Sequence, residues 1–584
     1  MEAKILVCVG TSGVAAGAEK IADSFESELK KHGLGESYTV VRTGDRGLFR
    51  DVLVDIIDED MGHATYQYVK VDDVPSLVES HIVNKTPFKK RLAGDDYKQF
   101  FESQTRIVLA NCGEIDPESI DEYMGKDGYG GLKKALDMKP EKVIEEILDS
   151  GLRGRGGAGF PAGRKWQMTA ANQADQKYVV CNADEGDPGA FMDRSVLEGD
   201  PHAVVEGMLI AGYSIGASEG YIYCRAEYPL AIKRLRKAIA DAEEKGYIGK
   251  NILGKTFDFK LKIKEGAGAF VCGEETALLA SIEGKRGRPI PRPPYPAAEG
   301  LWGKPTLINN VETLANVATI IRKGSGWYSS IGTEKSKGTK VFALAGKVKN
   351  TGLVEVPMGT TIRDIVFGPG GGMLSRRVGF KGVQLGGPSG GCLPENLLDT
   401  PIDYDSITKT GAIMGSGGMI VMDQRTCMVD LAKYFLEFTV AESCGKCVPC
   451  RIGLKRLLEV LEIICKGEGK DEHLVFLEEM SASIKNTALC GLGNSAPNPV
   501  LTTMRYFKDE YAVHMKEKEC PSHVCIDLVH FEVINERCSK CGRCFKACPV
   551  DAITWSKGEF AVIEKSKCIK CKSCINTCEY MAIQ

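Results

Sequence analysis

The sequence has no long apolar run and no strong excess of charge of one sign. No apolar run reaches the roughly 18 residues of a membrane-spanning helix. The net charge of −3 over 584 residues is too close to neutral to favour nucleic acid or an acidic membrane surface as a partner. The apolar start of the chain, Ile5–Val9, stops at Gly10, before it reaches the length of a signal-peptide core. We therefore expect a cytoplasmic protein that binds neither nucleic acid nor membranes, with about four domains.

Cysteine, in contrast, is abundant and unevenly placed. The chain contains 22 cysteines, and those from Cys427 to Cys578 make up most of them. Disulfides are rare in a large chain without a signal peptide, so metal ligation is the stronger interpretation.

Two cysteine runs near the C-terminus have the duplicated C-x2-C-x2-C-x3-C spacing of bacterial two-cluster ferredoxins. Thiolates are soft ligands that suit iron–sulfur clusters, and in this pattern the fourth cysteine of each run ligates the other cluster. The expected ligands of the first [4Fe–4S] cluster are Cys538, Cys541, Cys544 and Cys578, and those of the second are Cys568, Cys571, Cys574 and Cys548. A pair of zinc knuckles is the weaker alternative. Glu579 replaces the usual proline of the second run, which should matter little.

A third [4Fe–4S] cluster is predicted upstream, in a region of helical pattern. Cys444, Cys447 and Cys450 lie on one loop between two expected helices, and Cys490 at another helix end is the best candidate for the fourth ligand. A C-x2-C-x2-C run alone would also fit zinc or a structural turn; the distant fourth cysteine favours the cluster.

A zinc site is predicted between this helical region and the ferredoxin runs. His514, Cys520 and Cys525 lie within twelve residues, are not needed by any cluster, and suit tetrahedral zinc. The fourth ligand could be Cys427 or Cys465. The alternative is that these are reduced cysteines packed in a core.

The apolar pattern divides the chain into regions and predicts a multidomain α/β and α+β protein. Residues 1–80 predict a small α/β unit. Its expected strands are Ile5–Val9, Tyr38–Val41 and Tyr66–Val71, and its expected helices are Ala15–His32 and Leu48–Asp58. Residues 81–120 are predicted to be a linker that ends in a strand over Arg106–Ala110. The later regions are an α/β domain over 121–335, a β-rich domain over 336–420, a helical domain over 421–505, the zinc segment over 506–530 and the ferredoxin domain over 531–584. The expected helices of the helical domain are Val429–Val440, Leu454–Cys465 and His473–Lys485.

A glycine-rich loop, Gly154-Arg-Gly-Gly-Ala-Gly159, matches the dinucleotide fingerprint in letters only. The fingerprint follows a strand, whereas this loop follows a helical stretch, Pro140–Ser150, so a Rossmann unit is not expected. Successive glycines still allow backbone N–H groups to approach a phosphate closely. Arg153, Arg155 and Lys165 would add positive charge.

Five motifs in order carry a family resemblance. They are Gly151-Leu-Arg-Gly-Arg-Gly-Gly-Ala-Gly-Phe-Pro161, Cys181-Asn-Ala-Asp-Glu-Gly-Asp-Pro-Gly189, Cys272-Gly-Glu-Glu-Thr276, Pro293-Pro-Tyr-Pro-Ala297 and Asn309-Asn-Val-Glu-Thr313. With them, residues 120–505 resemble the FMN- and NADH-binding subunit of respiratory complex I and its relatives in soluble hydrogenases and bifurcating enzymes. With the ferredoxin runs added, the whole chain resembles the beta subunit of electron-bifurcating [FeFe]-hydrogenases and the matching subunit of bifurcating transhydrogenases.

The resemblance implies one FMN, a nicotinamide nucleotide, and a set of binding residues. The implied FMN phosphate site consists of Gly154, Gly156, Gly157 and Lys165, with Arg155 beside it. The implied isoalloxazine and ribityl contacts are Asn182, Asp184, Glu185, Gly273, Glu274, Asn309 and Asn310. The implied nucleotide contacts are Phe160, Glu275, Arg292 and Tyr295. Glu185 and Glu275 are the candidates for catalytic residues.

Three positions depart from the family pattern. Asp187 replaces glutamate and Arg292 replaces lysine, so both keep their charge, whereas Met168 replaces an aromatic residue and loses a stacking face. The cofactor can therefore be NAD or NADP.

The resemblance also implies a thioredoxin-like N-terminal domain, which in the family often holds a [2Fe–2S] cluster, and a β-grasp-like domain over 336–420. Of the four cluster positions only Cys8 is cysteine; the others are Gly13, Asp45 and Phe49. One thiolate cannot hold such a cluster. We expect three [4Fe–4S] clusters, one zinc site and no [2Fe–2S] cluster.

These features predict a subunit that takes hydride from NAD(P)H onto FMN and passes single electrons through its clusters. The implied partners are ferredoxin, a small [2Fe–2S] thioredoxin-like subunit and a catalytic iron–sulfur subunit of a hydrogenase, a formate dehydrogenase or a transhydrogenase, with electron bifurcation as the expected mode. The rival prediction is a non-catalytic relay and scaffold subunit whose flavin site is vestigial.

Overall fold

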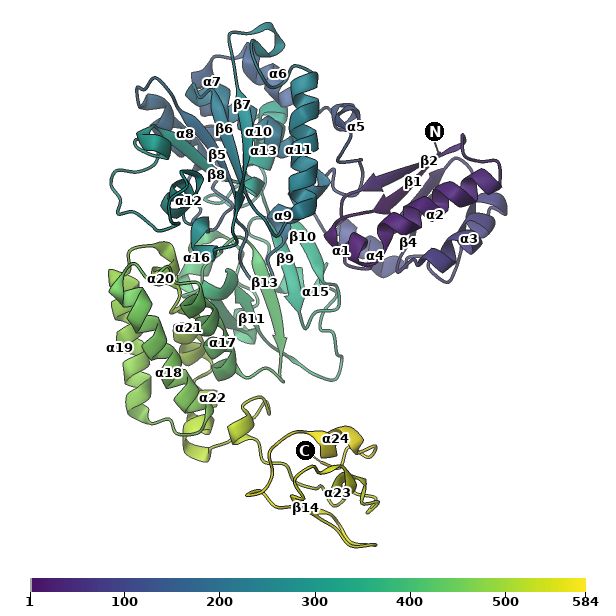
Figure 1. The fold of residues 1–584 in the computed structure, drawn as a ribbon, viewed down its shortest axis with the longest axis vertical. Coiled ribbons are helices and arrows are strands. Elements are labelled where there is room, and N and C mark those ends of the chain that lie inside the picture. The colour runs from purple at the N-terminus through teal and green to yellow at the C-terminus, as the bar shows by residue number, and fades with distance from the viewer. Residues whose placement is uncertain (1–2, 584) are drawn as a thin grey trace.

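The computed structural model describes residues 3–583, which form a series of folded units along the chain (Figure 1). An N-terminal unit lies beside a large α/β unit. A five-stranded sheet and a helical unit follow, and a small C-terminal unit is attached to the helical unit through a single chain segment. Among residues 3–583, no helix is both long and apolar enough to cross a membrane.

The N-terminal unit is a four-stranded sheet in the order β2-β1-β3-β4. Its strands are β1 (Ala3–Cys8), β2 (Tyr38–Thr43), β3 (Val54–Asp58) and β4 (Gly62–Tyr66), and helix α2 (Ala18–Lys31) packs on it. Strands β1 and β2 are parallel, whereas β3 is antiparallel to both β1 and β4. The helix predicted over Leu48–Asp58 is wrong, because Val54 and Ile56 are buried in the sheet core as alternate residues of β3.

The predicted strand over Arg106–Ala110 is also absent, because this segment is a turn held by a side chain from a distant strand. The Glu355 carboxylate accepts hydrogen bonds from the backbone N–H groups of Val108 and Leu109, each at 3.0 Å. The carboxylate also accepts the Thr339 hydroxyl at 2.5 Å. A side chain therefore satisfies the backbone donors that a neighbouring strand would otherwise bind.

The large α/β unit contains a parallel sheet in the order β7-β6-β5-β8. Its strands are β5 (Tyr178–Ala183), β6 (Glu219–Arg225), β7 (Lys260–Gly266) and β8 (Thr306–Asn310). Helices α10 (Pro201–Ile215) and α13 (Val311–Lys323) pack together and are buried along nearly their whole length. Burial of helices against the sheet is typical of parallel sheets. Because the four strands run in the same direction, their carboxyl ends lie at one edge of the sheet.

The five-stranded sheet has the order β10-β9-β13-β11-β12. Its strands are β9 (Thr339–Gly346), β10 (Gly352–Pro357), β11 (Phe380–Leu385), β12 (Gly391–Pro394) and β13 (Gly418–Asp423), and only β9 and β13 pair in parallel. The fully buried Lys340 on β9 forms an ion pair with Glu312 on α13. This pair joins the sheet to the α/β unit, since removal of either partner would leave a buried charge unpaired.

The helical unit confirms the expected helices as α17 (Met428–Ala441), α18 (Leu454–Cys465) and α19 (Asp471–Thr487), and adds α21 (Asn498–Tyr506). The C-terminal unit contains only short elements: α23 (Arg543–Ala547), β14 (Ile553–Thr554), β15 (Val562–Ile563) and α24 (Ser573–Thr577). Its small core includes cysteine side chains among the apolar ones. So small a core gives little hydrophobic stabilisation, and bound metal is a usual substitute.

We predict that Glu355→Ala loosens the segment around Arg106. Three hydrogen-bond donors lose their buried acceptor, which should destabilise the fold by roughly 3 kcal/mol. Trypsin should cleave after Arg106 faster than in the unmodified protein, and the first thermal transition should fall. Glu395→Ala is the matched control, because Glu395 belongs to the same unit and is exposed. Equal cleavage rates in the two variants would contradict this account of the turn.

Candidate functional site

The glycine loop joins α7 (Pro140–Asp149) to α8 (Ala162–Ala171) and packs against the end of strand β8. A Cβ on Gly156 would lie 3.0 Å from the Asn310 Cβ. Gly159 has φ +64°, and a Cβ there would lie 2.5 Å from the Tyr404 ring. The Tyr404 hydroxyl in turn donates to the Gly154 carbonyl at 2.7 Å. Only glycine at these positions allows the loop to lie so close to the strand end.

The basic side chains near this loop have different roles. Arg155 is fully buried and donates from its guanidinium to the carbonyls of Thr339 and Lys337 and to the Tyr328 hydroxyl. These donors anchor the loop, and the expected contribution of the Arg155 charge to a phosphate site stays a prediction. Lys165 remains at the site, 3.4 Å from the Glu275 carboxylate.

Three amide side chains meet at the carboxyl edge of the parallel sheet. Asn182 at the end of β5 donates to the Gly273 carbonyl at 2.9 Å. Asn309 accepts from the Trp166 indole at 2.9 Å. Asn310 donates to the Asp193 carboxylate at 2.5 Å. In α/β sheets, ligands bind at this edge, and the structure brings the amides predicted for a flavin together there.

Three buried carboxyl groups lie beside these amides. Asp184 has a side chain that is 1% exposed, and neither of its oxygens has a hydrogen-bond partner, although the Arg225 guanidinium lies 3.9 Å away. Burial raises its pKa to about 7, against the opposing effect of Arg225. Glu185 accepts from the backbone N–H groups of Asp193 at 2.9 Å and Arg194 at 3.1 Å, and burial raises its pKa. Asp187 accepts the Ser416 hydroxyl, and burial raises its pKa to about 6. A buried carboxyl group without a donor is unusual and indicates a binding site.

Asp193 was missed by the sequence analysis. It opens helix α9 (Met192–Gly199), contacts Asn310, and burial raises the pKa of its carboxyl group well above the ordinary range. No motif marks it in a single sequence, since its role depends on the distant strand end that it touches.

Three of the residues expected to bind a nucleotide lie together: Glu275, Arg292 and Tyr295, with the Arg292 guanidinium 5.9 Å from the Tyr295 ring centre. Glu275 accepts from Arg292 at 2.6 Å and lies beside Lys165. Phe160 is 44% exposed and Tyr295 is 51% exposed, so both aromatic faces are available for stacking. Exposed aromatic rings beside basic side chains suit a nucleotide base and its phosphates.

Glu274 is expected to contact the flavin ring, but one of its carboxylate oxygens caps a helix. Glu274 Oε2 accepts from the backbone N–H groups of Thr276 at 3.0 Å and Ala277 at 2.9 Å, which caps helix α12 (Glu275–Ile282). The cap fixes the direction in which this segment enters the helix.

Four thiols converge next to this segment, in what we term the upstream cup. Its cysteines are Cys444, Cys447, Cys450 and Cys490, and they line one small space. Val271 lines the same space. The backbone N–H of Phe270 donates to the Glu442 carboxylate at 2.9 Å, and Lys446 donates to the Pro289 carbonyl at 2.6 Å. The cup is thus docked onto the segment that carries Gly273.

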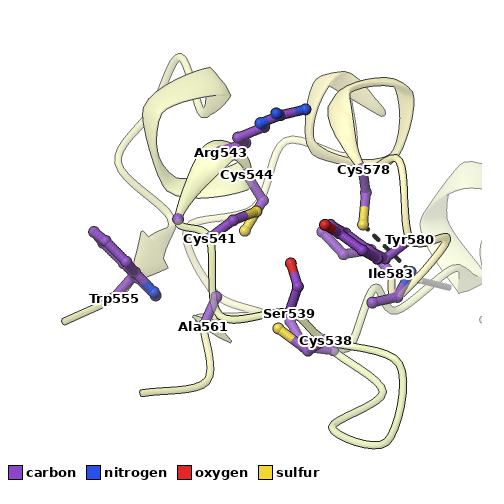
Figure 2. Close-up of a pocket in the computed structure, with 13 residues that line it drawn as sticks. Cys538, Ser539, Cys541, Arg543, Cys544, Trp555, Ala561, Cys578, Tyr580 and Ile583 are labelled. Atoms are coloured by element: carbon purple, nitrogen blue, oxygen red, sulfur yellow. Dashed lines mark hydrogen bonds between the residues drawn. The ribbon is translucent and has the colours of Figure 1, made fainter. Parts of the chain in front are cut away.

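The C-terminal unit contains two further cups. One, shown in Figure 2, is lined by Cys538, Cys541, Cys544 and Cys578. The other is lined by Cys548, Cys568, Cys571 and Cys574. Each cup therefore takes its fourth cysteine from the other run, as the spacing predicted. Glu579, which replaces proline, forms an ion pair with Arg543 at the rim of the first cup.

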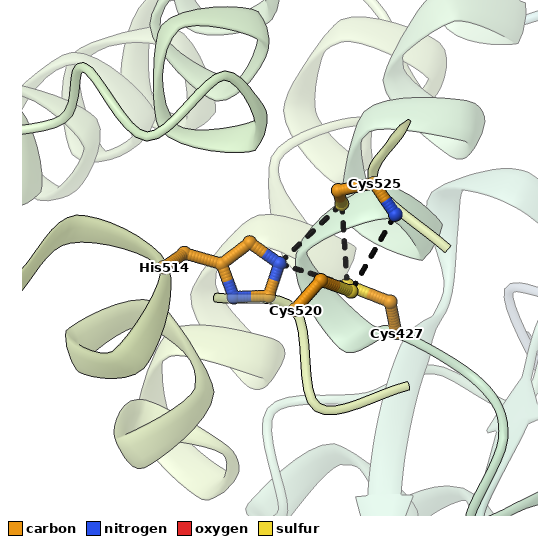
Figure 3. Close-up of side chains that lie close together, drawn as sticks. All are labelled: Cys427, His514, Cys520 and Cys525. Atoms are coloured by element: carbon orange, nitrogen blue, oxygen red, sulfur yellow. Dashed lines mark hydrogen bonds between the residues drawn. The ribbon is translucent and has the colours of Figure 1, made fainter. Parts of the chain in front are cut away.

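One His and three Cys side chains meet between α17 and the C-terminal unit (Figure 3). Within the described residues, the donor atoms of Cys427, His514, Cys520 and Cys525 lie within 4.8 Å of one another, and all four are buried. The His514 Nε2 is 3.3 Å from the Cys427 sulfur and 3.4 Å from the Cys525 sulfur. His514 Nδ1 binds the Glu510 carbonyl at 2.7 Å, which orients the ring toward the thiols. The structure selects Cys427 over Cys465 as the fourth member of this group.

Comparison with known proteins places three family matches on these regions. A Nuo51 FMN-binding domain matches residues 147–319, an NADH-ubiquinone oxidoreductase-F iron–sulfur binding region matches residues 430–514, and a 4Fe-4S binding domain matches residues 531–554. The chain is 58% identical over 456 residues to NADP-reducing hydrogenase subunit HndC of Solidesulfovibrio fructosivorans, which covers 78% of this chain and 93% of that protein.

A second relative and a solved structure are also similar to this chain. An F-type NADH-quinone oxidoreductase subunit of Rhizobium meliloti is 45% identical over 418 residues, which cover 71% of this chain and 99% of that protein. Among solved structures, an NAD+-reducing [NiFe]-hydrogenase in the H2-reduced state aligns with a TM-score of 0.63 at 29% identity, over 88% of this chain and 84% of that chain.

We predict that Gly159→Ala strongly reduces the flavin content of the purified protein. The new methyl group would collide with the Tyr404 ring and displace the loop. Gly254→Ala is the matched control, because Gly254 also has a positive φ, +76°, but a Cβ there meets no atom within 4 Å. Flavin absorbance per chain measures the effect, and equal flavin content in the two variants would show that the loop does not form the flavin site.

Proposed function

This chain belongs to the family of FMN- and [4Fe–4S]-binding subunits that includes the F-type subunits of NADH-quinone oxidoreductase, and we propose that it carries electrons between NAD(P)H and both ferredoxin and a partner subunit. As a member, it is a subunit of an NAD(P)H-dependent oxidoreductase. Its relatives are subunits of hydrogenase and of complex I. The proposal concerns the cofactor ligands, the order of the centres and the acceptors.

The shared wall between the flavin region and the upstream cup carries this proposal. Gly273 accepts from Asn182 at the sheet edge, while Val271, two residues earlier, lines the cup. Cys444 and Leu492 pack against the same apolar cluster as Val271. An electron that leaves the sheet edge would therefore reach the upstream cup before either of the two C-terminal cups.

Bound FMN would supply the conversion between two-electron hydride transfer and one-electron transfer. The glycine loop and Lys165 would hold its phosphate, and Asn182 and Asn310 would orient its ring system. Asp184 offers buried carboxylate oxygens that still lack a donor, which suits an N–H or O–H group of the bound cofactor. Glu275, Arg292 and Tyr295 would bind the nicotinamide nucleotide, with NAD or NADP as the substrate.

Each of the three cups fits a [4Fe–4S] cluster. Four cysteine side chains line each one, and cluster ligation by four thiolates is the usual arrangement. In the two C-terminal cups, the sulfurs of Cys548 and Cys578 accept backbone N–H groups at 3.2 and 3.3 Å, an interaction that tunes cluster potential. We place the upstream cluster first and the two C-terminal clusters after it.

The group of Cys427, His514, Cys520 and Cys525 fits zinc. Tetrahedral bonds of ~2.3 Å to sulfur and ~2.0 Å to nitrogen place sulfurs ~3.8 Å apart and sulfur and nitrogen ~3.5 Å apart. The Cys427 and Cys525 sulfurs are 3.7 Å apart, and both sulfur–nitrogen distances agree with this geometry.

We assign the N-terminal sheet to a thioredoxin-like domain without a [2Fe–2S] cluster. The Asp45 carboxylate accepts from Ser12, and the Phe49 ring packs 4.9 Å from Phe191 of the α/β unit. The backbone N–H of Thr11 donates to Glu198 at 2.8 Å. The face that would carry a cluster is thus closed against the neighbouring unit, which suits a scaffold role. The five-stranded sheet is assigned to a β-grasp-like domain.

The assembly proposed for this subunit is cytoplasmic and contains a catalytic iron–sulfur subunit and a small [2Fe–2S] subunit. The name of the relative HndC supports a hydrogenase as the catalytic partner. Formate dehydrogenase and transhydrogenase partners are tested by identifying the subunits that purify with the native protein. Bifurcation is tested in that complex by asking whether ferredoxin and NAD(P) are reduced only together.

We predict that Cys447→Ser blocks electron flow beyond the flavin. NAD(P)H should still bleach the flavin absorbance, whereas ferredoxin reduction should fall sharply, because the first acceptor loses one of its four ligands. Cys112→Ser is the control, since Cys112 is a buried cysteine far from every cup in sequence. If ferredoxin reduction persists in Cys447→Ser, the proposed order of centres is wrong; if NAD(P)H does not reduce the flavin even in the unmodified protein, the chain is a relay without catalysis.

We also predict that His514→Ala loses most of its zinc. The loss should at least match the roughly 10–100-fold effects known for outer-shell partners of metal sites. His523→Ala is the control, because His523 lies in the same segment and is exposed. Elemental analysis of both variants measures zinc and iron together. Unchanged zinc in His514→Ala would exclude this site.

A further inference from the structure

A fifth thiol lies beside the group assigned to zinc. Cys465 is the last residue of α18 and is buried. Its sulfur, the Cys525 sulfur and an Asp430 carboxylate oxygen lie within 4.8 Å of one another. Four donors already complete a tetrahedral site without Cys465. Cys465 is therefore an additional thiol, not needed for zinc, that lies next to the zinc-site residue Cys525.

A second metal is the less suitable explanation of this additional thiol. The Lys433 ammonium group lies 2.9 Å from the Asp430 carboxylate. Asp430 is thus already paired with a cation, and a second metal ion would have to displace that ammonium group. Without Asp430, Cys465 and Cys525 alone offer two donors, too few for a stable site.

We propose that Cys465 and Cys525 form a reversible disulfide when the protein meets a hydroperoxide, and that this bond dismantles the zinc site. The inference rests on the zinc assignment made above. The Cys525 thiolate attacks one peroxide oxygen, the O–O bond breaks, and Cys525 becomes a sulfenic acid while hydroxide leaves. The Cys465 thiol then attacks the Cys525 sulfur, forms the S–S bond and releases water, its proton going to the leaving oxygen. Two electrons pass from the two sulfurs to the peroxide.

The disulfide would remove one donor from the group and leave Cys427, Cys520 and His514. These three residues come from the start of α17, from the segment before the C-terminal unit, and from the π-helix η9 (Val513–Glu517), which continues α22 (Lys508–Ala512). Loss of the metal would therefore remove the bonds that hold these three segments together, which no single helix or strand joins.

The element most affected is the tether, which we define as residues 518–530, between the helical unit and the ferredoxin unit. Besides its cysteines, the tether is held to the helical unit by Leu528, which is buried in the core of that unit, and by hydrogen bonds of Ser522, from Lys381 at 3.2 Å and to the Thr426 carbonyl at 3.0 Å. Leu528 follows Cys525 in the chain, so it holds the end of the tether and not residues 518–524. Oxidation of Cys465 and Cys525 would thus loosen residues 518–524, which lose their metal anchor, while the new S–S bond keeps Cys525 attached to α18.

The test uses the full-length, cofactor-loaded protein, purified without oxygen and treated with a small excess of hydrogen peroxide. Zinc release is followed with a chromogenic chelator, and disulfides are mapped by mass spectrometry after alkylation. Trypsin cleavage after Lys518 reports the freedom of the tether. Cys465→Ser is compared with Cys112→Ser, which removes a buried thiol elsewhere.

In the unmodified protein and in Cys112→Ser, we expect a Cys465–Cys525 disulfide, released zinc and faster cleavage of the tether, all reversed by dithiothreitol with added zinc. In Cys465→Ser, zinc release should be roughly tenfold slower, because no resolving thiol is present. Equal release in Cys465→Ser, or a disulfide that joins Cys525 to a different cysteine, would overturn the switch. Absence of zinc before treatment would overturn the zinc assignment. Flavin reduction by NAD(P)H before oxidation reports separately on the proposed redox function.

Discussion

Two hydrogen bonds between distant parts of the chain set the geometry on which electron transfer depends. Phe270 binds Glu442, 172 positions away, and Lys446 binds the Pro289 carbonyl, 157 positions away. These bonds dock the loop of the upstream cup onto the segment that borders the sheet edge. The same two parts also pack through Cys444 and Leu492, which lie against the apolar cluster of Val271. The proposed order of the centres thus depends on contacts that neither unit could make alone.

The carboxyl edge of the parallel sheet is prepared for a ligand before any ligand binds. Asp184 is buried with no hydrogen-bond donor on its oxygens and with the Arg225 guanidinium at 3.9 Å, an arrangement that destabilises a folded protein. Glu185 and Asn310 use neighbouring backbone and side-chain groups to fix their own positions. The rigid, polar edge therefore lowers the stability of the empty protein, and a bound cofactor with matching donors would restore it.

The sequence predicted the thiol groups well because their spacing is local and duplicated. It predicted less where distant contacts decide the structure. The apolar run over Leu48–Asp58 fits either a helix or a strand, and only pairing with β1 selects the strand. The segment Arg106–Ala110 is shaped by Glu355, more than 200 positions away. Arg155 has the right charge for a phosphate site, but its direction depends on Thr339 and cannot be read from one sequence.

The exchange of fourth cysteines in the C-terminal unit has a consequence for biogenesis. Cys578 completes the cup of the first run and Cys548 completes that of the second. Neither run can close its own cup, so a nascent chain that has been made only as far as Cys548 has no complete coordination sphere in this unit. The second cup gains its last cysteine at Cys574 and the first cup at Cys578, so both are completed late in synthesis and almost together. The first run, although it is made first, therefore has the later-completed cup.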